Sequence, residues 1–254
     1  MNYYSREKIK IMSDKFSFSA TPPKQGFKLL MLLAMFYLTV DLASCALAYK
    51  FVKINELFFS AETLIFPVTY TITDIIAEVY GYRIARNLIW LVLFCDFLFA
   101  LSTSLLVRIP SPTIQIQETY NFVFADLLRG STAEIAGVLC GIFTNVYAIS
   151  KLKILVKGKY FWLRSIGSSS IGEAVLVLIA MPIMFLGKIS TSQLLILMIC
   201  SYCYKIIFAI TAAYPASMMV RAVKKIEKLD VYDYNVNFNP FSVFSKKEIE
   251  DLGG

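Results

Sequence analysis

The stretch Phe66-Pro-Val-Thr-Tyr-Thr-Ile-Thr-Asp-Ile-Ile-Ala-Glu-Val-Tyr-Gly81 places two acidic residues in a segment otherwise apolar enough to cross a membrane. An ionised carboxylate is costly in hydrocarbon, so intramembrane acids face a protein interior or an aqueous cavity and usually serve function. Asp74 and Glu78 are four residues apart and therefore share one face of a helix. We interpret the stretch as a polar-lined transport or binding helix.

The composition around this stretch indicates a polytopic membrane protein that resides in a lipid bilayer. The chain has 254 residues, of which 57% are hydrophobic, and its mean hydropathy is +0.64. A soluble domain of this size rarely reaches that apolar content. The net charge is +7, and the basic residues lie between apolar spans, which indicates cytoplasmic loops rather than nucleic-acid binding. Histidine is absent, which excludes serine–histidine and cysteine–histidine catalysis, the HExxH metal motif and a histidine proton relay.

Windows of about twenty mostly apolar residues predict an all-α membrane protein with six transmembrane helices. The predicted spans are 27–48, 57–80, 88–107, 132–149, 166–186 and 194–220. The segment 120–128 is shorter and amphipathic, and we interpret it as an interfacial piece. The predicted organisation is an N-terminal tail (1–26), a six-helix transport domain (27–220) and a C-terminal tail (221–254).

Basic residues orient the predicted bundle. They concentrate in the N-terminal tail, in the second and fourth connections and after the last span, whereas the other connections hold few. The positive-inside rule therefore predicts that both termini are cytoplasmic. Spans one to three and four to six then have opposite orientations, as in an inverted 3+3 repeat. Span five carries Gly167-Ser-Ser-Ser-Ile-Gly172 followed by Glu173, a weak internal echo of the acid-bearing span two.

The five cysteines all fall within apolar segments, so we expect no disulfides. Cys200 and Cys203 have C-x-x-C spacing, but two cysteines without further soft ligands make a weak metal site, and we predict no metal site and no cofactor. Leu42-Ala-Ser-Cys45 resembles a lipoprotein cleavage box. Cleavage there would leave five spans and spoil the charge alternation, so we expect an uncleaved first helix.

Polar residues within the spans are the candidates for function. For the acids, an interhelical contact and a ligand contact both remain open, and we expect Lys205 to be an internal counter-ion because a lone ammonium at mid-span would lose its proton. Aromatic residues beside these charges, including Tyr70 and Tyr202, either face lipid or stack on a planar ligand. The intramembrane charged residues are Asp41, Glu62, Asp74, Glu78, Asp96, Glu134, Glu173 and Lys205, with Asp126 and Arg129 at the entrance to span four.

FPVTYTITDIIAEVYGYRIARNLIW (66–90) resembles the signature of the queuosine precursor transporter family, also described as a vitamin-uptake-type integral membrane family. Its usual form is Phe-Pro, an apolar stretch, Thr-Asp, Glu-Val-Tyr-Gly and a basic Ala-Arg segment. Further matches run in the same order from about 57 to 241. They are Arg129, Trp162-Leu-Arg164 with the Gly-Ser-Ser-Ser-Ile-Gly stretch, Tyr202-x-Tyr204-Lys205, Pro215, Tyr232-Asp233 and Asn237-Phe-Asn-Pro-Phe241.

The resemblance implies a six-helix importer of 7-deazaguanine bases, such as 7-cyano-7-deazaguanine, in the bacterial inner membrane. The imported precursor would feed queuosine synthesis for transfer RNA modification. The resemblance also implies an architecture similar to the substrate-binding subunits of energy-coupling-factor transporters, without their ATPase module. The substrate-binding residues predicted for this small planar heterocycle are Asp74, Glu78, Tyr70, Arg129, Glu173, Tyr202 and Lys205.

The chain departs from the family pattern at several polar positions. Leu176-Val177 stands where many relatives have Asp-Thr, Glu62 where a glycine is common, and many relatives carry an acid near Asn145. Lost polar partners change specificity sharply when a base is recognised by its hydrogen-bonding edge.

A secondary carrier is the function that the sequence favours, and two other functions are alternatives to it. One is a substrate-binding component that needs a separate ATPase, since the chain has no Gly-x-x-x-x-Gly-Lys-Ser/Thr phosphate loop. The other is an intramembrane enzyme with Asp74 and Glu78 as an acid pair, which the lack of histidine and of a nucleophile motif disfavours. Gly137 and Gly141 have G-x-x-x-G spacing, which permits helix pairing within the chain or in a homo-oligomer.

Overall fold

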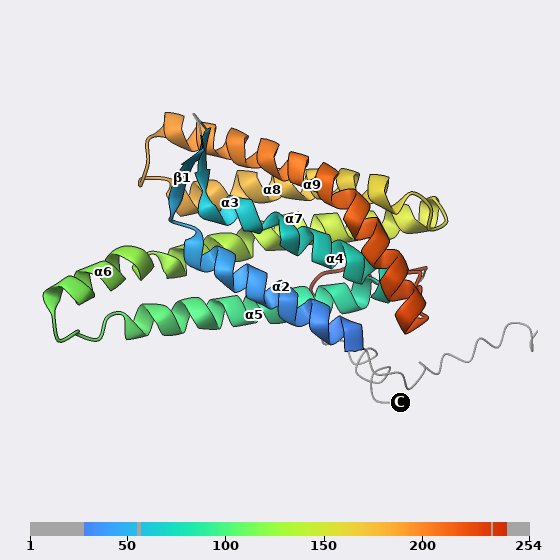
Figure 1. Cartoon of the computed structure of the whole chain (residues 1–254), viewed down its shortest axis with the longest axis horizontal. Coiled ribbons are helices and arrows are strands. Elements are labelled where there is room, and N and C mark those ends of the chain that lie inside the picture. The colour runs from blue at the N-terminus through green and yellow to red at the C-terminus, as the bar shows by residue number, and fades with distance from the viewer. Residues whose placement is uncertain (1–27, 55–56, 235, 243–254) are drawn as a thin grey trace, which may run out of the picture.

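The computed structural model describes residues 28–54, 57–234 and 236–242, and Figure 1 shows a bundle of long helices running side by side. The predicted N-terminal tail (1–26), Phe27 and residues 243–254 of the predicted C-terminal tail lie outside the described residues. The elements are α2 (Lys28–Leu47), β1 (Phe51–Ile54), β2 (Leu57–Ser60), α3 (Ala61–Ile65), α4 (Pro67–Tyr80), α5 (Tyr82–Leu106), α6 (Ile114–Phe124), α7 (Leu127–Leu155), α8 (Phe161–Phe185) and α9 (Thr191–Glu227).

Among the described residues, five helices are long and apolar enough to cross a membrane. They are Lys28–Leu47, Tyr82–Leu106, the continuous α6–α7 segment Ile114–Leu155, Phe161–Phe185 and Thr191–Glu227. Large apolar side chains such as Met31 on α2, Phe94 on α5, Leu178 on α8 and Ile207 on α9 are exposed. An exposed apolar surface of this kind is expected where lipid, not water, surrounds the helices.

The predicted single helix over 57–80 is wrong. Its first residues form β2, which pairs antiparallel with β1 in a two-stranded hairpin, and the rest forms the short helix α3 and then α4. Pro67 is the first residue of α4, where its missing N–H and fixed φ are tolerated, and it separates α4 from α3. The fold is therefore mostly helical rather than purely α, and the acid-bearing helix is shorter than predicted.

Helix α4 lies in the middle of the bundle (Figure 1). Twelve of its 14 residues are buried, so it faces protein on all sides. It ends at Gly81, whose φ of 88° suits glycine, and a Cβ there would lie 2.8 Å from Val231 Cγ1. At about 1.5 Å per residue, α4 is roughly 21 Å long, shorter than the hydrocarbon thickness of about 30 Å.

Glycines bring α7 and α8 into close contact. A Cβ on Gly141 would lie 2.6 Å from the carbonyl oxygen of Gly172, and a Cβ on Gly172 would lie 2.7 Å from that of Gly141. A Cβ on Gly137 would lie 2.8 Å from the Ala180 side chain. The G-x-x-x-G pair thus serves packing within the chain, one of the two uses that the sequence left open.

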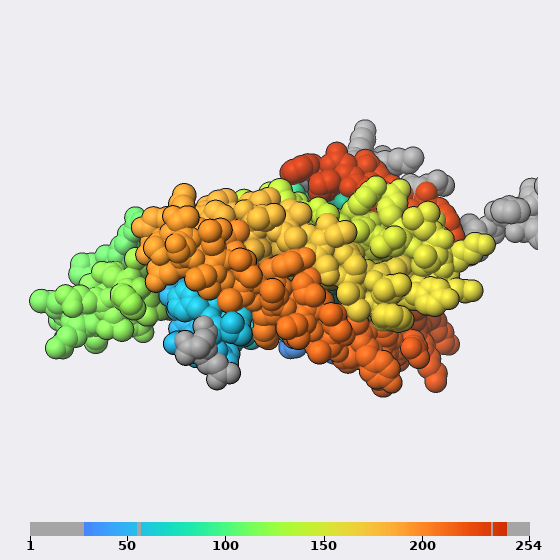
Figure 2. Space-filling model, turned by 90° about the horizontal axis from the view of Figure 1, so that it is seen from above, coloured from blue at the N-terminus to red at the C-terminus, as the bar shows by residue number. Residues whose placement is uncertain are grey.

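Residues 229–234 and 236–242 pack against the end of α4 and the start of α5. Both carboxylate oxygens of Asp233 accept the backbone N–H of Tyr82 at 3.1 Å, and the Trp90 Nε1–H donates to the carbonyl oxygen of Pro240 at 2.7 Å. Figure 2 shows the face formed by α8 and α9, with the turn between α7 and α8 at one end. Because these contacts join distant parts of the sequence, the end of the bundle that carries the C-terminal segment is tightly held.

Candidate functional site

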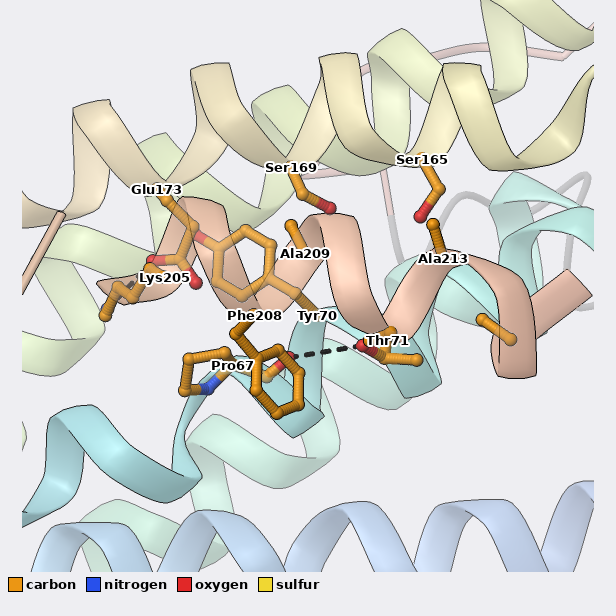
Figure 3. A pocket seen from close by; sticks show the side chains of 12 residues that line it. Pro67, Tyr70, Thr71, Ser165, Ser169, Glu173, Lys205, Phe208, Ala209 and Ala213 are labelled. Atoms are coloured by element: carbon orange, nitrogen blue, oxygen red, sulfur yellow. Dashed lines mark hydrogen bonds and ion pairs between the residues drawn. The ribbon is translucent and has the colours of Figure 1, made fainter. Parts of the chain in front are cut away.

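A small cavity lies between α4, α8 and α9 (Figure 3). Its free volume is about 10 Å³, roughly the space that one water molecule needs. One part of its lining is polar and charged, and the α9 side carries small alanines. The lining residues are Pro67, Tyr70, Thr71, Ser165, Ser169, Glu173, Lys205, Phe208, Ala209, Ala212, Ala213 and Ala216.

Asp74 lies directly behind this lining and is fully buried. Its Oδ1 accepts a hydrogen bond from Asn145 Nδ2 at 2.7 Å, and its Oδ2 accepts from the hydroxyls of Ser165 and, at 3.2 Å, Ser169. All three donors are neutral, so they solvate the carboxylate without balancing a charge. Asp74 thereby connects α4 to α7 and α8, and through the two serines it reaches the cavity wall.

Glu173 and Lys205 form a buried ion pair across the cavity, with Glu173 Oε2 2.8 Å from Lys205 Nζ. The ammonium also lies 4.8 Å from the centre of the Phe66 ring, within cation–π range. Glu173 Oε1 has no hydrogen-bond partner among the described residues. The pair is therefore balanced in charge but retains an acceptor that a ligand N–H can fill.

Aromatic side chains complete the cavity. Figure 3 shows the Tyr70 ring beside Glu173 and Lys205, with Phe208 and Pro67 at the opposite wall. The buried Tyr70 hydroxyl has no hydrogen-bond partner among the described residues. The arrangement combines flat apolar surfaces with an acid, a base and hydroxyl groups, the mixture of apolar lining and a few placed polar groups that is typical of small-molecule sites.

Glu78, one turn beyond Asp74, belongs to a different group of charges, which we call the Glu78 cluster. Its carboxylate lies 2.9 Å from Arg164, 2.8 Å from Lys224 and 3.9 Å from Lys153. Lys153 and Lys224 also contact Asp230, at 2.6 and 2.9 Å. The carboxylate is thus surrounded by three cations that hold the ends of α4, α7, α8 and α9 together.

The same end of the bundle has an open cleft of about 330 Å³. Its wall is formed by Glu78 and Lys224 with residues of the α7–α8 turn and of α9. The Glu78 carboxylate faces this cleft and does not line the cavity between α4, α8 and α9. The two acids share one face of α4, as predicted from their spacing, but they lie in different surroundings.

Two further predicted ligands lie elsewhere. Arg129, at the start of α7, donates to the carbonyl oxygens of Ile183 and Leu186 at 2.8 and 2.6 Å, and so caps the end of α8. Tyr202 directs its hydroxyl to the carbonyl oxygen of Ser170 at 3.4 Å and is not part of the cavity wall. Of the seven predicted residues, the structure thus brings Tyr70, Glu173 and Lys205 together, with Asp74 behind them.

Ser165, Ser169 and Asn145 were not among the site residues predicted from the sequence. Ser165, Ser169 and Glu173 are spaced by four, so they lie on one face of α8. This spacing could have predicted that the two serines share a site with Glu173. The Asn145 amide donates a hydrogen bond to the Asp74 carboxylate at 2.7 Å, a contact between residues 71 positions apart that no local spacing predicts.

Residues 60–220 match the model of the family described as "Putative vitamin uptake transporter". This match spans more than half of the chain and includes helices α3 to α8 and most of α9. The chain belongs to this transporter family. Comparison with curated proteins and with solved structures found no match. As a member of a transporter family with several apolar helices, the protein is a multi-pass membrane transporter and not an enzyme.

Proposed function

We propose that this vitamin uptake transporter imports a queuosine precursor, a 7-deazaguanine base such as 7-cyano-7-deazaguanine, for modification of transfer RNA. The sequence resemblance over 57–241 supports this choice of substrate. The observation that carries it is the cavity wall, in which the ion pair Glu173–Lys205 and the Asp74-bound serines lie beside Tyr70 and Phe208.

The chemistry of the ligand edge fits this wall. A deazaguanine presents N–H donors on its amino-pyrimidinone edge together with a carbonyl acceptor. The unpartnered Oε1 of Glu173 accepts from the donors, Lys205 donates to the carbonyl, and Tyr70 stacks on the ring. A site built from such buried polar groups rejects an analogue that lacks their partners, because the groups are then left unpaired.

Substrate binding requires the cavity to widen. The present free volume of about 10 Å³ is far below the roughly 300 Å³ or more of a typical ligand pocket. The small alanines of α9 offer little resistance to movement, so we propose that α9 moves away from α4 and α8 to admit the base. The structure then corresponds to an occluded conformation in an alternating-access cycle.

The proposed topology has six crossings, with α3 and α4 together forming the second and with both termini on the cytoplasmic side of a bacterial inner membrane. The grouping of basic residues supports this orientation. Lys153, Arg164 and Lys224 meet at one end of the bundle, next to the start of α5, which carries Arg83 and Arg86. We also propose that the two halves of the bundle form an inverted 3+3 repeat and that the protein forms a homo-oligomer.

An uptake assay tests the proposed substrate. Cells unable to synthesise the base are supplied with 7-cyano-7-deazaguanine, and queuosine in their transfer RNA is measured. We expect queuosine to appear with the wild-type chain and with Glu118→Gln, an exposed acid on α6, and to be lost with Glu173→Gln. Transfer RNA without queuosine, despite wild-type protein in the membrane, would contradict the proposal.

The second candidate is a substrate-binding component of an energy-coupling-factor type transporter for a vitamin or nucleobase. The family description favours a vitamin as cargo, and the lack of a phosphate loop means that ATP would act through another chain. Uptake that depends on a co-purifying ATPase pair, with a vitamin stabilising the protein where deazaguanines do not, supports this candidate over the first.

A further inference from the structure

A second group of acids lies on helices that do not line the cavity. Cys45 on α2, Asp96 on α5 and Glu134 on α7 place one sulfur and two carboxylate oxygens within 4.8 Å of one another. All three residues are buried, with Asp96 fully enclosed and Glu134 only 5% exposed. Asp41, one turn before Cys45 on the same buried face of α2, adds a further carboxyl group.

The oxygens that face this group are not satisfied by the protein. Asp96 Oδ1 and Glu134 Oε1 have no hydrogen-bond partner among the described residues. No ion pair within the described part of the chain joins a lysine or arginine to Asp96 or Glu134, in contrast to Glu173 and Glu78. Buried polar atoms are normally paired, so two unpaired carboxylate oxygens on residues of one buried group call for a partner that the described residues do not supply.

The surroundings make water a poor substitute for that partner. Cys45, Ala100 and Leu127 form an apolar cluster with Phe99, Phe124 and Leu128 packed against it. Carboxylates in such a setting carry a large desolvation cost unless a compensating charge lies beside them.

We propose that Cys45, Asp96 and Glu134 bind a divalent cation that accepts both sulfur and oxygen ligands, such as Zn²⁺. Tetrahedral ligand atoms about 2.0–2.3 Å from a zinc ion lie roughly 3.3–3.8 Å apart. The three atoms lie within 4.8 Å of one another, so small side-chain movements bring them to this spacing. The two carboxylates and the Cys45 thiolate together carry three negative charges, of which a divalent ion neutralises two, and a thiolate ligand favours zinc-like ions over Mg²⁺ or Ca²⁺. Binding displaces the thiol proton of Cys45 to solvent.

Ser131 orients one of the ligands. Its hydroxyl donates to Asp96 Oδ2 at 2.6 Å, which leaves Oδ1 directed at the proposed ion. The ion would connect α2, α5 and α7, whereas the cavity is lined by α4, α8 and α9. It would be linked to the cavity through α7, which carries both Glu134 and Asn145, about 17 Å apart along the helix axis.

No sequence spacing reveals this group, because its three ligands come from three separate helices. The C-x-x-C pair Cys200–Cys203, the sequence feature typical of a metal site, lies on α9 with Cys203 exposed. The proposed site therefore departs from the sequence-based expectation that the chain has no metal site. It does not rest on the identity of the transported substrate.

Cobalt binding tests the proposal without any transport assay. Purified full-length protein in detergent is treated with a chelator, desalted and titrated with Co²⁺. We expect one ion per chain, a sulfur-to-cobalt charge-transfer band in the near ultraviolet, and displacement of that ion by Zn²⁺ but not by Na⁺. The melting temperature should rise on titration, because an ion bound to the folded state stabilises it.

Matched variants assign the ligands. Cys45→Ser, a nearly isosteric change, should remove the band, while the exposed Cys203→Ser should leave it intact. Asp96→Asn and Glu134→Gln should weaken Co²⁺ binding by about tenfold or more, and Glu118→Gln should not. An absence of Co²⁺ and Zn²⁺ binding to folded wild-type protein, binding without the band, or a band that persists in Cys45→Ser would each overturn the proposal.

Discussion

Asp74 and Glu78 are neighbours on α4, yet their surroundings differ in kind. Asp74 is held by one amide and two hydroxyls, whereas Glu78 is surrounded by Arg164, Lys224 and Lys153. The neutral donors do not cancel the negative charge of an ionised Asp74, so that charge can interact with a ligand. The three cations around Glu78 cancel its charge within the protein. One turn of helix thus separates a region suited to binding from a region that holds the bundle together.

The largest expected effect is on stability, from Glu78→Gln. Removing this carboxylate leaves three cations close together without their common counter-charge, and breaking a buried charge cluster costs about 3–5 kcal/mol. We expect a corresponding fall in the free energy of unfolding in detergent, with the affinity of the remaining folded protein for its substrate little changed. An unchanged unfolding midpoint would show that the Glu78 cluster is not structural.

The next largest effect is on binding, from Asp74→Asn. The substitution keeps the size of the side chain but replaces one accepting oxygen with an N–H donor, so it disturbs the hydrogen bonds that position Ser165 and Ser169 in the cavity wall. We expect about 100-fold weaker substrate binding, or about 2.7 kcal/mol, with a small change in the melting temperature. A variant that loses stability but binds normally would reverse the assignment of the two acids.

The contact between α7 and α8 supports both regions, and Gly141→Ala should disturb it. The added Cβ would lie 2.6 Å from the carbonyl oxygen of Gly172, and such overpacking costs about 1–3 kcal/mol. Gly167→Ala is the matched control, because an added Cβ there would meet no neighbouring side chain or packed element within 4 Å. Thermal unfolding should show a loss for Gly141→Ala and no loss, or a slight gain, for Gly167→Ala.

The smallest expected effect concerns Asp230, at the exposed edge of the Glu78 cluster. Partial burial raises its pKa, but hydrogen bonds and charge attraction from Lys153 and Lys224 outweigh burial and hold the pKa below its usual value. A depressed pKa contributes stability above the unfolded value of about 3.9, and that contribution is lost as pH falls through the folded pKa.

Asp230→Asn should therefore lower stability by less than about 1 kcal/mol at pH 7, since solvent screens the pair. The difference from wild type should be the same at pH 5 and should shrink only below about pH 4. Unfolding midpoints measured at these pH values check this sign. A difference that grows as the pH falls would contradict it.

Hydropathy predicted the long helices because their outer faces carry apolar side chains over enough residues to cross a bilayer. It did not predict the break in the second span, because Pro67 is compatible with the first turn of a helix and the flanking residues are equally apolar. The Gly-Ser-Ser-Ser-Ile-Gly stretch and Glu173 were singled out from the sequence, and Ser169 and Glu173 line one cavity in the structure. Their role in binding stays a prediction.

The expected role of Lys205 as an internal counter-ion is confirmed by its pairing with Glu173, but the charge partners of Glu78 were not predicted from the sequence. Lys153 and Arg164 were counted as loop residues that orient the bundle, yet both are buried against Glu78. The pairing joins residues about 75 and 86 positions apart, and only the packing of α4 against α7 and α8 brings them together. The group of Cys45, Asp96 and Glu134 could not be predicted either, because its members come from three helices that only the fold brings together.

The most direct test of the central claim is calorimetric titration of purified protein with 7-cyano-7-deazaguanine, comparing wild type, Asp74→Asn, Glu78→Gln and the exposed control Glu118→Gln. We predict binding to wild type and to both glutamine variants, with affinity about 100-fold lower for Asp74→Asn. Wild-type affinity in Asp74→Asn, or loss of binding only in folded Glu78→Gln, would contradict the assignment of the site to the Asp74 region.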